Sequence, residues 1–359
     1  MPESAADYVC LRMLGRGSFG SVYESRRRGT ASAVSSFGDK CVDKCAVKTI
    51  NKGLMHKAGM SSRVVNEVEI HCQLKHDSVV NLHSFFEDAD HVYLVMELCP
   101  YGDLGSLLKK RATPFSDVAC RPYVSQLLDG LAYLHSHGIV HRDLKLSNLL
   151  LVTETKLKIG DFGLAVRLDA SGAKRTGDTL CGTPNYISPE VAQKQPHGPQ
   201  SDLWALGCIV YAMLCGRPPF DSPKVSTTLA RVVSCDYSLL PPPPATIPTA
   251  LQPGVGRGDG TAAGEDMVGV VGCGEGSAAG DCVRRLLRLD PEMRMTVDDV
   301  RAHPFMTGQG TFAGQGTQAG KGGVRADRAE RVSVEEGVQG RATGEVPVTV
   351  DWVNVKSHT

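Results

Sequence analysis

The spacing of apolar residues changes once along the chain, near residues 96–102. Before this point the apolar residues come in short runs rich in β-forming types, which favour strands of an antiparallel sheet. Only 61–74 has helical spacing in this part. The runs that we expect to form strands are 8–14, 21–24, 45–50 and two runs within 81–98 that flank a turn at 87–90.

Beyond the change, the spacing is mostly helical. The expected helices are 103–110, 116–137, 201–215 and 281–289, and only 156–159 is strongly β in character. The pattern predicts an α+β fold of two lobes. We expect a small N-lobe at 8–97, built from an antiparallel sheet and one main helix. A larger, mainly helical C-lobe at 98–306 would follow, joined to it through a hinge at 96–102.

Two segments are poor in the residues that build a core. Residues 241–276 open with four prolines and are rich in glycine, and much of 307–359 is of similarly low complexity. Such a composition buries too little apolar surface to offset the entropy of the chain. We expect a disordered insertion in the C-lobe and a mostly disordered C-terminal tail. The final apolar stretch, 345–355, would form a lone strand, a docking peptide or only an apolar patch.

Charge and cysteine usage narrow the class of protein. The 359 residues include 39 Lys or Arg and 39 Asp or Glu, and this balance argues against a polyanion partner such as nucleic acid. No apolar run approaches the ~20 residues of a membrane-spanning helix, and the first residues lack a secretory signal. The twelve cysteines include no CxxC pair, which disfavours disulfides and zinc. We expect a cytoplasmic or nuclear protein without a membrane partner.

A glycine-rich run of the form GxGxxGxV lies between the first two expected strands. Such glycines let backbone N–H groups approach phosphate oxygens, but a plain hairpin turn uses the same residues. Lys48, on the next expected strand, could hold phosphates, and Glu67 on the following helix could pair with it. The members of the run that we single out are Leu14, Gly15, Arg16, Gly17, Ser18, Phe19, Gly20 and Val22.

The most specific motifs occur in the C-lobe. HRDLKLSN at 141–148 is followed by DFG at 161–163 and by SPE at 188–190. With the glycine run and Lys48, this series resembles the eukaryotic protein kinases, in which these elements occur in this order. The resemblance implies the bilobal protein kinase fold and ATP and Mg²⁺ as cofactors. The substrates would be proteins with Ser or Thr acceptors.

The resemblance also implies a role for each catalytic residue. Asp143 would lie near the acceptor hydroxyl, and Lys48, paired with Glu67, would hold the nucleotide phosphates. Asn148 and Asp161 would bind Mg²⁺ through hard oxygen atoms. Lys145 would stabilise the transferring phosphoryl group and indicates Ser/Thr rather than Tyr specificity.

Further positions are carried over from the family. Met96 would be the gatekeeper beside the adenine, and Asp103 would lie near the ribose. The backbone of Glu97 and Cys99 would bond to the base, and the residues that sandwich its ring would be Val22, Ala46 and Leu150. Structural roles fall to His71, stacked with Leu82, Phe162 and His141, to Asp202 behind the catalytic loop, and to an ion pair of Glu190 with Arg294.

Within the kinases, the chain is most similar to the polo-like kinases of the Sak type, which drive centriole duplication. The similarity rests on KAGM at 57–60, NEVEIHCQLKH, HSHGIVHRDLKLSNLLL, LCGTPNYISPE and GRPPFDS, and covers 8–240 and 281–306. It implies a location at the centriole or centrosome, in the cytoplasm or in the nucleus. We expect a kinase domain without the polo boxes of that family. Another Ser/Thr kinase subfamily and a non-catalytic pseudokinase scaffold are the alternatives.

The segment 161–190 predicts a regulatory switch. A phosphate on Thr179 would bring almost two negative charges within reach of Arg142 and order the segment. The family suggests autophosphorylation in trans, which implies self-association. We expect Thr183 to bond instead to Asp143 and Lys145, as part of the platform for the substrate.

Overall fold

The computed structural model describes residues 3–17, 19–28, 44–111, 113–168, 181–239 and 277–308. The predicted insertion at 241–276 lies outside these residues, as do Ser18, Thr179 and the tail beyond 308. Among the described residues, no helix is long and apolar enough to cross a membrane.

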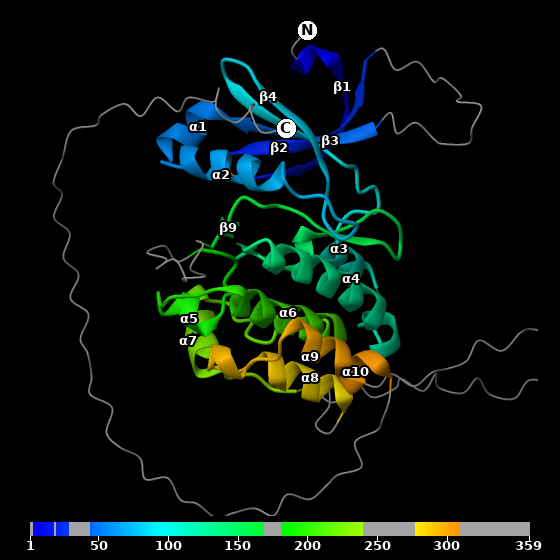
Figure 1. The fold of residues 1–359 in the computed structure, drawn as a ribbon, viewed down its shortest axis with the longest axis vertical. Coiled ribbons are helices and arrows are strands. Elements are labelled where there is room, and N and C mark those ends of the chain that lie inside the picture. Colours follow the sequence, from blue (N-terminus) through cyan, green and yellow to red (C-terminus); the bar gives the residue numbers. More distant parts are fainter. Residues whose placement is uncertain are drawn as a thin grey trace, which may run out of the picture. The chain divides into compact units, whose positions relative to one another are not determined.

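The N-lobe is built on a five-stranded antiparallel sheet with the order β1-β2-β3-β5-β4 (Figure 1). Its strands begin and end close to the predicted runs, because β-branched and aromatic residues alternate along them. The strands are β1 (Tyr8–Arg16), β2 (Gly20–Arg27), β3 (Lys44–Asn51), β4 (Leu82–Glu87) and β5 (His91–Met96), and a short 3₁₀ helix, Ala5–Asp7, precedes β1.

Two helices accompany this sheet, where the sequence predicted one. The predicted helix is α2 (Ser61–His71), which ends three residues earlier than expected. The unexpected helix is α1 (Lys52–Lys57), and its N-cap Asn51 accepts a hydrogen bond from the N–H of Leu54. With only six residues, α1 is too short to produce a periodic apolar pattern, so its N-cap was the only local signal.

The C-lobe is mainly helical, as predicted. The four expected helices are α3 (Leu104–Lys110), α4 (Asp117–Ser136), α6 (Pro199–Cys215) and α8 (Ala278–Leu286). Four helices were not expected: α5 (Pro189–Ala192), α7 (Val225–Ser234), α9 (Val297–Ala302) and α10 (Pro304–Thr307). Two small antiparallel pairs also occur, β6 (Ile139–Val140) with β9 (Val166–Arg167) and β7 (Leu149–Leu151) with β8 (Leu157–Ile159). Strand β8 is therefore not the single β segment that the sequence indicated.

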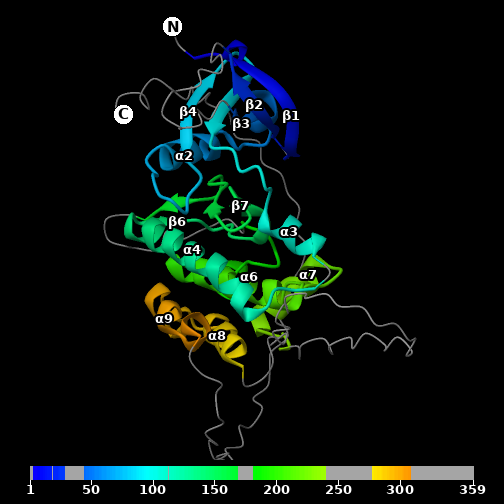
Figure 2. The same ribbon diagram turned by 90° about the vertical axis from the view of Figure 1, so that its right-hand side faces the viewer.

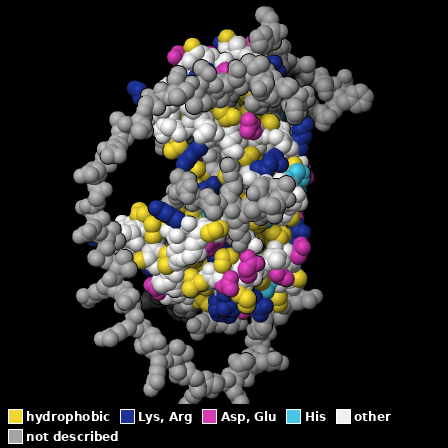
Figure 3. All heavy atoms as spheres, turned by 60° about the vertical axis from the view of Figure 1, so that its left-hand side comes forward, with side chains coloured by type: hydrophobic (Ala, Val, Ile, Leu, Met, Phe, Trp, Pro, Cys, Tyr) yellow, Lys and Arg dark blue, Asp and Glu magenta, His cyan; other side chains and the backbone are white. Residues whose placement is uncertain are grey.

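Helix α6 forms the centre of the C-lobe. Fourteen of its seventeen residues are buried, and Trp204 stacks on Phe220 with ring centroids 5.4 Å apart. Figure 2 shows α6 beside α4, with α8 and α9 beyond it. A Cβ on Gly207 would lie 2.9 Å from side-chain atoms of Leu286 and Leu287, so this glycine allows α8 to approach α6 closely. The surface in Figure 3 carries Lys and Arg side chains interspersed with Asp and Glu.

Candidate active site

The glycine-rich run forms the connection between β1 and β2. The N–H of Gly17 donates to the carbonyl of Gly20 over 2.8 Å. The sequence placed all three glycines in the turn, but Gly15 lies within β1 and Gly20 begins β2. A Cβ on Gly20 would lie 1.7 Å from the carbonyl oxygen of Thr49, whereas a Cβ on Gly15 would meet nothing within 4 Å. Gly20 is thus required by packing against β3, and the open space at Gly15 leaves the backbone accessible to a ligand.

Lys48 in β3 is bonded to two carboxylates from different parts of the fold. Its Nζ lies 2.6 Å from Oε1 of Glu67 in α2 and 3.3 Å from Oδ1 of Asp161, which follows β8. Side-chain burial alone would lower the pKa of Lys48, but the two carboxylates outweigh it and raise this pKa above its ordinary value. The charge of Lys48 in turn holds the pKa of Asp161 below its usual range. Lys48 and Asp161 are therefore both charged at neutral pH.

Residues of the loop at 141–148, called the catalytic loop after its predicted role, form a second cluster around the carboxylate of Asp143. Lys145 donates from Nζ to Asp143 Oδ2 over 2.6 Å and to Thr183 Oγ1 over 2.9 Å. The Thr183 hydroxyl donates to Asp143 Oδ1, also over 2.9 Å. Asn148 donates its amide N–H to the Asp143 carbonyl over 2.9 Å. The expected contacts of Thr183 with Asp143 and Lys145 are thus present, and they tie residues 181–188 to the catalytic loop.

Two residues of the site have left-handed backbone conformations, which are unfavourable for residues other than glycine. Arg142 has φ 67° and Asp161 has φ 63°. Part of the compensation comes from Asp202 in α6, whose carboxylate accepts the N–H groups of His141 and Arg142, each over 3.0 Å. Asp202 therefore anchors the catalytic loop, as expected. The Arg142 side chain contacts the sulfur of Cys181.

A column of buried rings connects the cluster around Lys48 with the cluster around Asp143. The rings of His71 and Phe162 are 4.7 Å apart, and those of Phe162 and His141 are 5.2 Å apart. His71 Nε2 hydrogen-bonds the Val80 carbonyl over 2.7 Å. Burial lowers the pKa of His71 to about 4. The neutral His71 ring thus links α2 to Phe162, beside Asp161.

The hinge presents backbone groups suited to an adenine ring. Met96, the predicted gatekeeper, pairs with Ala46 of β3. The Glu97 N–H donates to the Asn81 carbonyl over 2.9 Å. Within the described part of the chain, the Glu97 carbonyl and the Cys99 N–H have no hydrogen-bond partner. These two groups are the ones expected to bind the base. Leu150 in β7 packs beside Gly160, near Asp161.

Asp103 has a local structural role that accounts for its position. Its Oδ1 accepts the N–H of Ser106 over 2.8 Å and its Oδ2 accepts the Ser106 hydroxyl over 2.6 Å. Asp103 is therefore the N-cap of α3. Its backbone forms a bridge with Leu150, so the residue still lies beside the expected floor of the nucleotide site.

The predicted ion pair in the C-lobe is fully buried. Arg294 donates from both terminal nitrogens to the two carboxylate oxygens of Glu190, each over 2.7 Å. The exposed fractions of the two side chains are 0% and 4%. This bidentate pair connects the end of the 181–190 segment to the loop after α8.

Sequence reasoning missed two polar contacts around the site. Asn66 in α2 donates to the Ala165 carbonyl over 2.7 Å, which ties α2 to the segment after Phe162. Lys158 in β8 bonds to Glu97 in the hinge over 2.8 Å. Neither contact has a local sequence signal, because a lysine on a strand and an asparagine on a helix are most often solvated.

Comparison with known proteins identifies the class of this fold and site. The model of the protein kinase domain family matches residues 8–306, and the chain belongs to this family. Among curated proteins it is similar to the serine/threonine-protein kinase PLK4 of Danio rerio, with 42% identity over 89% of this chain and 29% of the relative. The serine/threonine-protein kinase PLK4 of Xenopus tropicalis is 42% identical over 85% of this chain and 28% of the relative.

A third relative with lower identity is also a kinase of this name. The PLK4 kinase of Nematostella vectensis is 39% identical over 86% of this chain and 27% of its own length. The predicted bilobal kinase fold and the predicted resemblance to polo-like kinases are both confirmed. The chain spans less than a third of the length of these three relatives.

The residues present fit a nucleotide with magnesium. The side-chain nitrogen of Asn148 donates to the Asp143 carbonyl, so the side-chain oxygen of Asn148 remains for a cation. Asp161 offers a carboxylate beside the charged Lys48. Oxygen donors of this kind are the ligands that Mg²⁺ prefers, and a lysine among them suits the phosphates that such an ion accompanies.

Proposed function

We propose that this chain is an ATP-dependent protein kinase that transfers the γ-phosphoryl group to Ser or Thr of protein substrates. The observation that carries this proposal is the double ion pair of Lys48 with Glu67 and Asp161. It joins the phosphate-binding strand, helix α2 and the metal-binding residue in one arrangement. Phosphoryl transfer depends mostly on such positioning and on charge stabilisation.

The chemistry assigned to each residue follows from its contacts. Bound ATP with Mg²⁺ would supply the phosphoryl group, and Asn148 and Asp161 would hold the metal. Asp143 accepts a proton from the substrate hydroxyl through the carboxylate that Lys145 and Thr183 orient. The ammonium of Lys145 then faces the negative charge that develops on the transferred group. The Glu97 carbonyl and the Cys99 N–H select the base.

Control of the activity rests on Arg142. Its guanidinium is part-buried, and its Nε has no hydrogen-bond partner among the described residues. A phosphate on Thr179, which lies outside the described residues, would supply oxygen acceptors for this cation. We infer that the activating modification is autophosphorylation at Thr179 between two copies of the chain. The resemblance to Sak-type kinases supports a role in centriole duplication, with a location at the centrosome or in the nucleus.

The test is phosphate incorporation from ATP and Mg²⁺ into the protein itself and into casein. Wild type is compared with Asp161→Asn, which removes the negative charge beside Lys48 but keeps the size of the side chain. We expect incorporation on Ser and Thr by wild type, with Thr179 among the sites found by mass spectrometry, and at least a hundredfold less by the variant.

A matched control uses a carboxylate outside the site. Asp129 lies on α4 and forms an exposed ion pair with Arg301 of α9. Asp129→Asn removes this pair and should keep wild-type activity. A folded wild-type protein that binds nucleotide but transfers no phosphate would refute the proposal and favour a scaffold. Full activity of Thr179→Ala would refute the regulatory part alone.

A further inference from the structure

Lys158 is a buried cation that the proposed chemistry does not use. It lies in the middle of β8 between Leu157 and Ile159, whose side chains are fully buried on the opposite face of the strand. Only 9% of Lys158 is exposed. Its Nζ lies 2.8 Å from Oε2 of Glu97 and 3.4 Å from the carbonyl of Val79.

Three segments that are distant in the sequence meet at this ammonium group. Strand β8 leads directly to Asp161, and its Ile159 exchanges backbone hydrogen bonds with Ser78 and Val80 over 2.8 and 2.9 Å. The segment 78–81 is therefore fixed to β8 through its backbone. The hinge is attached to that segment through Glu97, whose carboxylate accepts the Asn81 N–H over 3.2 Å.

Lys158 completes this connection between β8 and the hinge. The same Glu97 oxygen accepts from Asn81 and from Lys158, and the Glu97 N–H donates back to the Asn81 carbonyl. The Glu97 side chain is thus held from two sides, while its own carbonyl has no partner among the described residues. Removing the ammonium would leave a carboxylate that is 24% exposed next to a single backbone donor.

A stability role alone gives a poor account of a charge at this position. Desolvation of a lysine largely offsets the attraction of its partner, so an apolar side chain would stabilise the fold about as well. What the ion pair adds is a fixed position for Glu97, because directed bonds from two segments leave its side chain little freedom.

We propose that Lys158 is a positioning residue for recognition of the purine base, acting through its ion pair with Glu97. It holds the hinge so that the Glu97 carbonyl and the Cys99 N–H keep the spacing that an adenine edge requires. The inference deepens the proposed function, but it concerns binding of the nucleotide and not transfer of phosphate.

The experiment compares the affinity of two ligands for the full chain. ADP engages the hinge through its base, whereas inorganic triphosphate can contact only the phosphate-binding residues. For Lys158→Met, which keeps most of the length of the side chain but removes the ammonium, we expect the Kd of ADP to rise roughly three- to tenfold, as for partial loss of one charged hydrogen bond. The Kd of triphosphate should stay within about twofold of wild type. Lys158→Arg should restore most of the ADP affinity.

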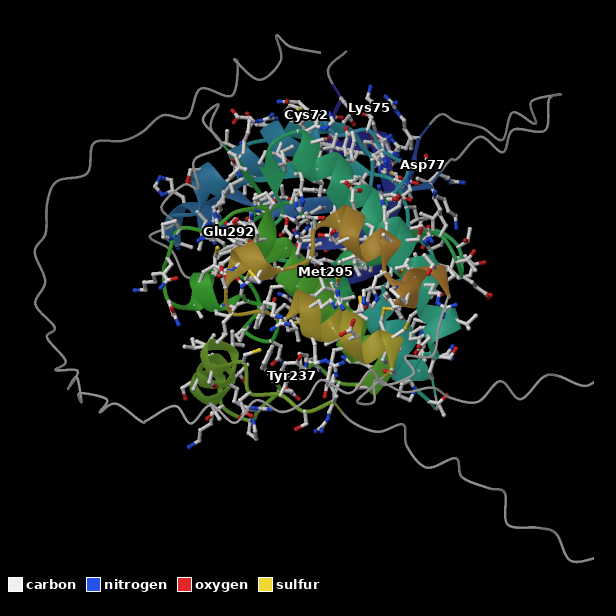
Figure 4. The ribbon with its side chains drawn as sticks, turned by 60° about the horizontal axis from the view of Figure 1, so that its bottom comes forward. Cys72, Lys75, Asp77, Tyr237, Glu292 and Met295 are labelled. Carbon is white, nitrogen blue, oxygen red and sulfur yellow. The ribbon has the colours of Figure 1, made fainter. Side chains whose placement is uncertain are left out.

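Lys156→Met is the matched control. Lys156 lies two residues before Lys158 and also pairs with an acid, but its partner Asp77 is 93% exposed and the ions are 3.6 Å apart. Figure 4 shows Asp77 at the rim of the molecule. Such a surface pair contributes little, so both affinities should match wild type.

The outcomes separate this proposal from its rivals. Equal weakening of ADP and triphosphate by Lys158→Met would indicate a general loss of structure and overturn the inference. Unchanged ADP affinity would overturn it as well. Both affinities are measured without turnover, so a wild type that binds ADP but transfers no phosphate would refute the kinase proposal and leave this one standing or falling on its own result.

Discussion

Mild acid should destabilise this fold through one buried histidine. His71 lies in the ring column, 1% exposed, with Nε2 bonded to the Val80 carbonyl. Its Nδ1 is buried and has no hydrogen-bond partner among the described residues, so a second proton would find no acceptor. The unfolded chain binds that proton near pH 6.5, whereas the folded state binds it only near its pKa of about 4.

The sign and the size of the effect follow from linkage. Above pH 6.5 neither state takes up the proton, and the contribution to stability is fully present. As the pH falls from 6.5 toward about 4, the unfolded state is protonated first, so the free energy of unfolding decreases. At pH 5 the loss is about 2 kcal/mol, and it approaches about 3 kcal/mol at still lower pH, since each pKa unit is worth about 1.4 kcal/mol.

Urea unfolding at pH 7.5 and pH 5 measures this difference. Other carboxylates and histidines also titrate, so the informative quantity is the loss in wild type minus the loss in His71→Leu, which keeps an apolar column. We expect this difference to be about 2 kcal/mol. The exposed His83→Gln on β4 serves as control and should lose stability as wild type does. Equal losses in wild type and His71→Leu would refute the reasoning.

Two further predictions concern packing. Arg294→Met leaves the buried Glu190 carboxylate without its cation and should cost about 3–5 kcal/mol in urea unfolding, whereas the double variant with Glu190→Gln should recover part of the loss. A smaller effect of the single variant than of the double would contradict this. Gly20→Ala places a Cβ against the Thr49 carbonyl and should lower Tm and nucleotide affinity, whereas Gly15→Ala should leave Tm unchanged. If the two alanines lowered Tm equally, the close contact at Gly20 would not be the cause.

Local patterns in the sequence were sufficient for much of the fold. The strands of the N-lobe and the long helices α4 and α6 could be predicted, because alternation and helical spacing report which face of an element is buried. Short elements escaped prediction. Helix α1 and strand β6 contain too few residues to show a period, and they form because neighbouring parts of the chain pack against them.

The candidate site can likewise be divided into features that the sequence predicted and features that it did not. The order of the motifs resembles that of the protein kinases, and this resemblance pointed to Asp143, Asn148 and Asp161 as candidate reactive groups. The sequence by itself therefore determined the class of protein and predicted which groups would be reactive.

Only the tertiary structure decided how these groups are held. The contact of Lys48 with Asp161 and that of Lys158 with Glu97 join residues more than sixty positions apart. The lowered pKa of His71 likewise depends on burial by distant segments. Such contacts have no local period or motif, because they arise from the packing of elements whose own sequences do not record their neighbours.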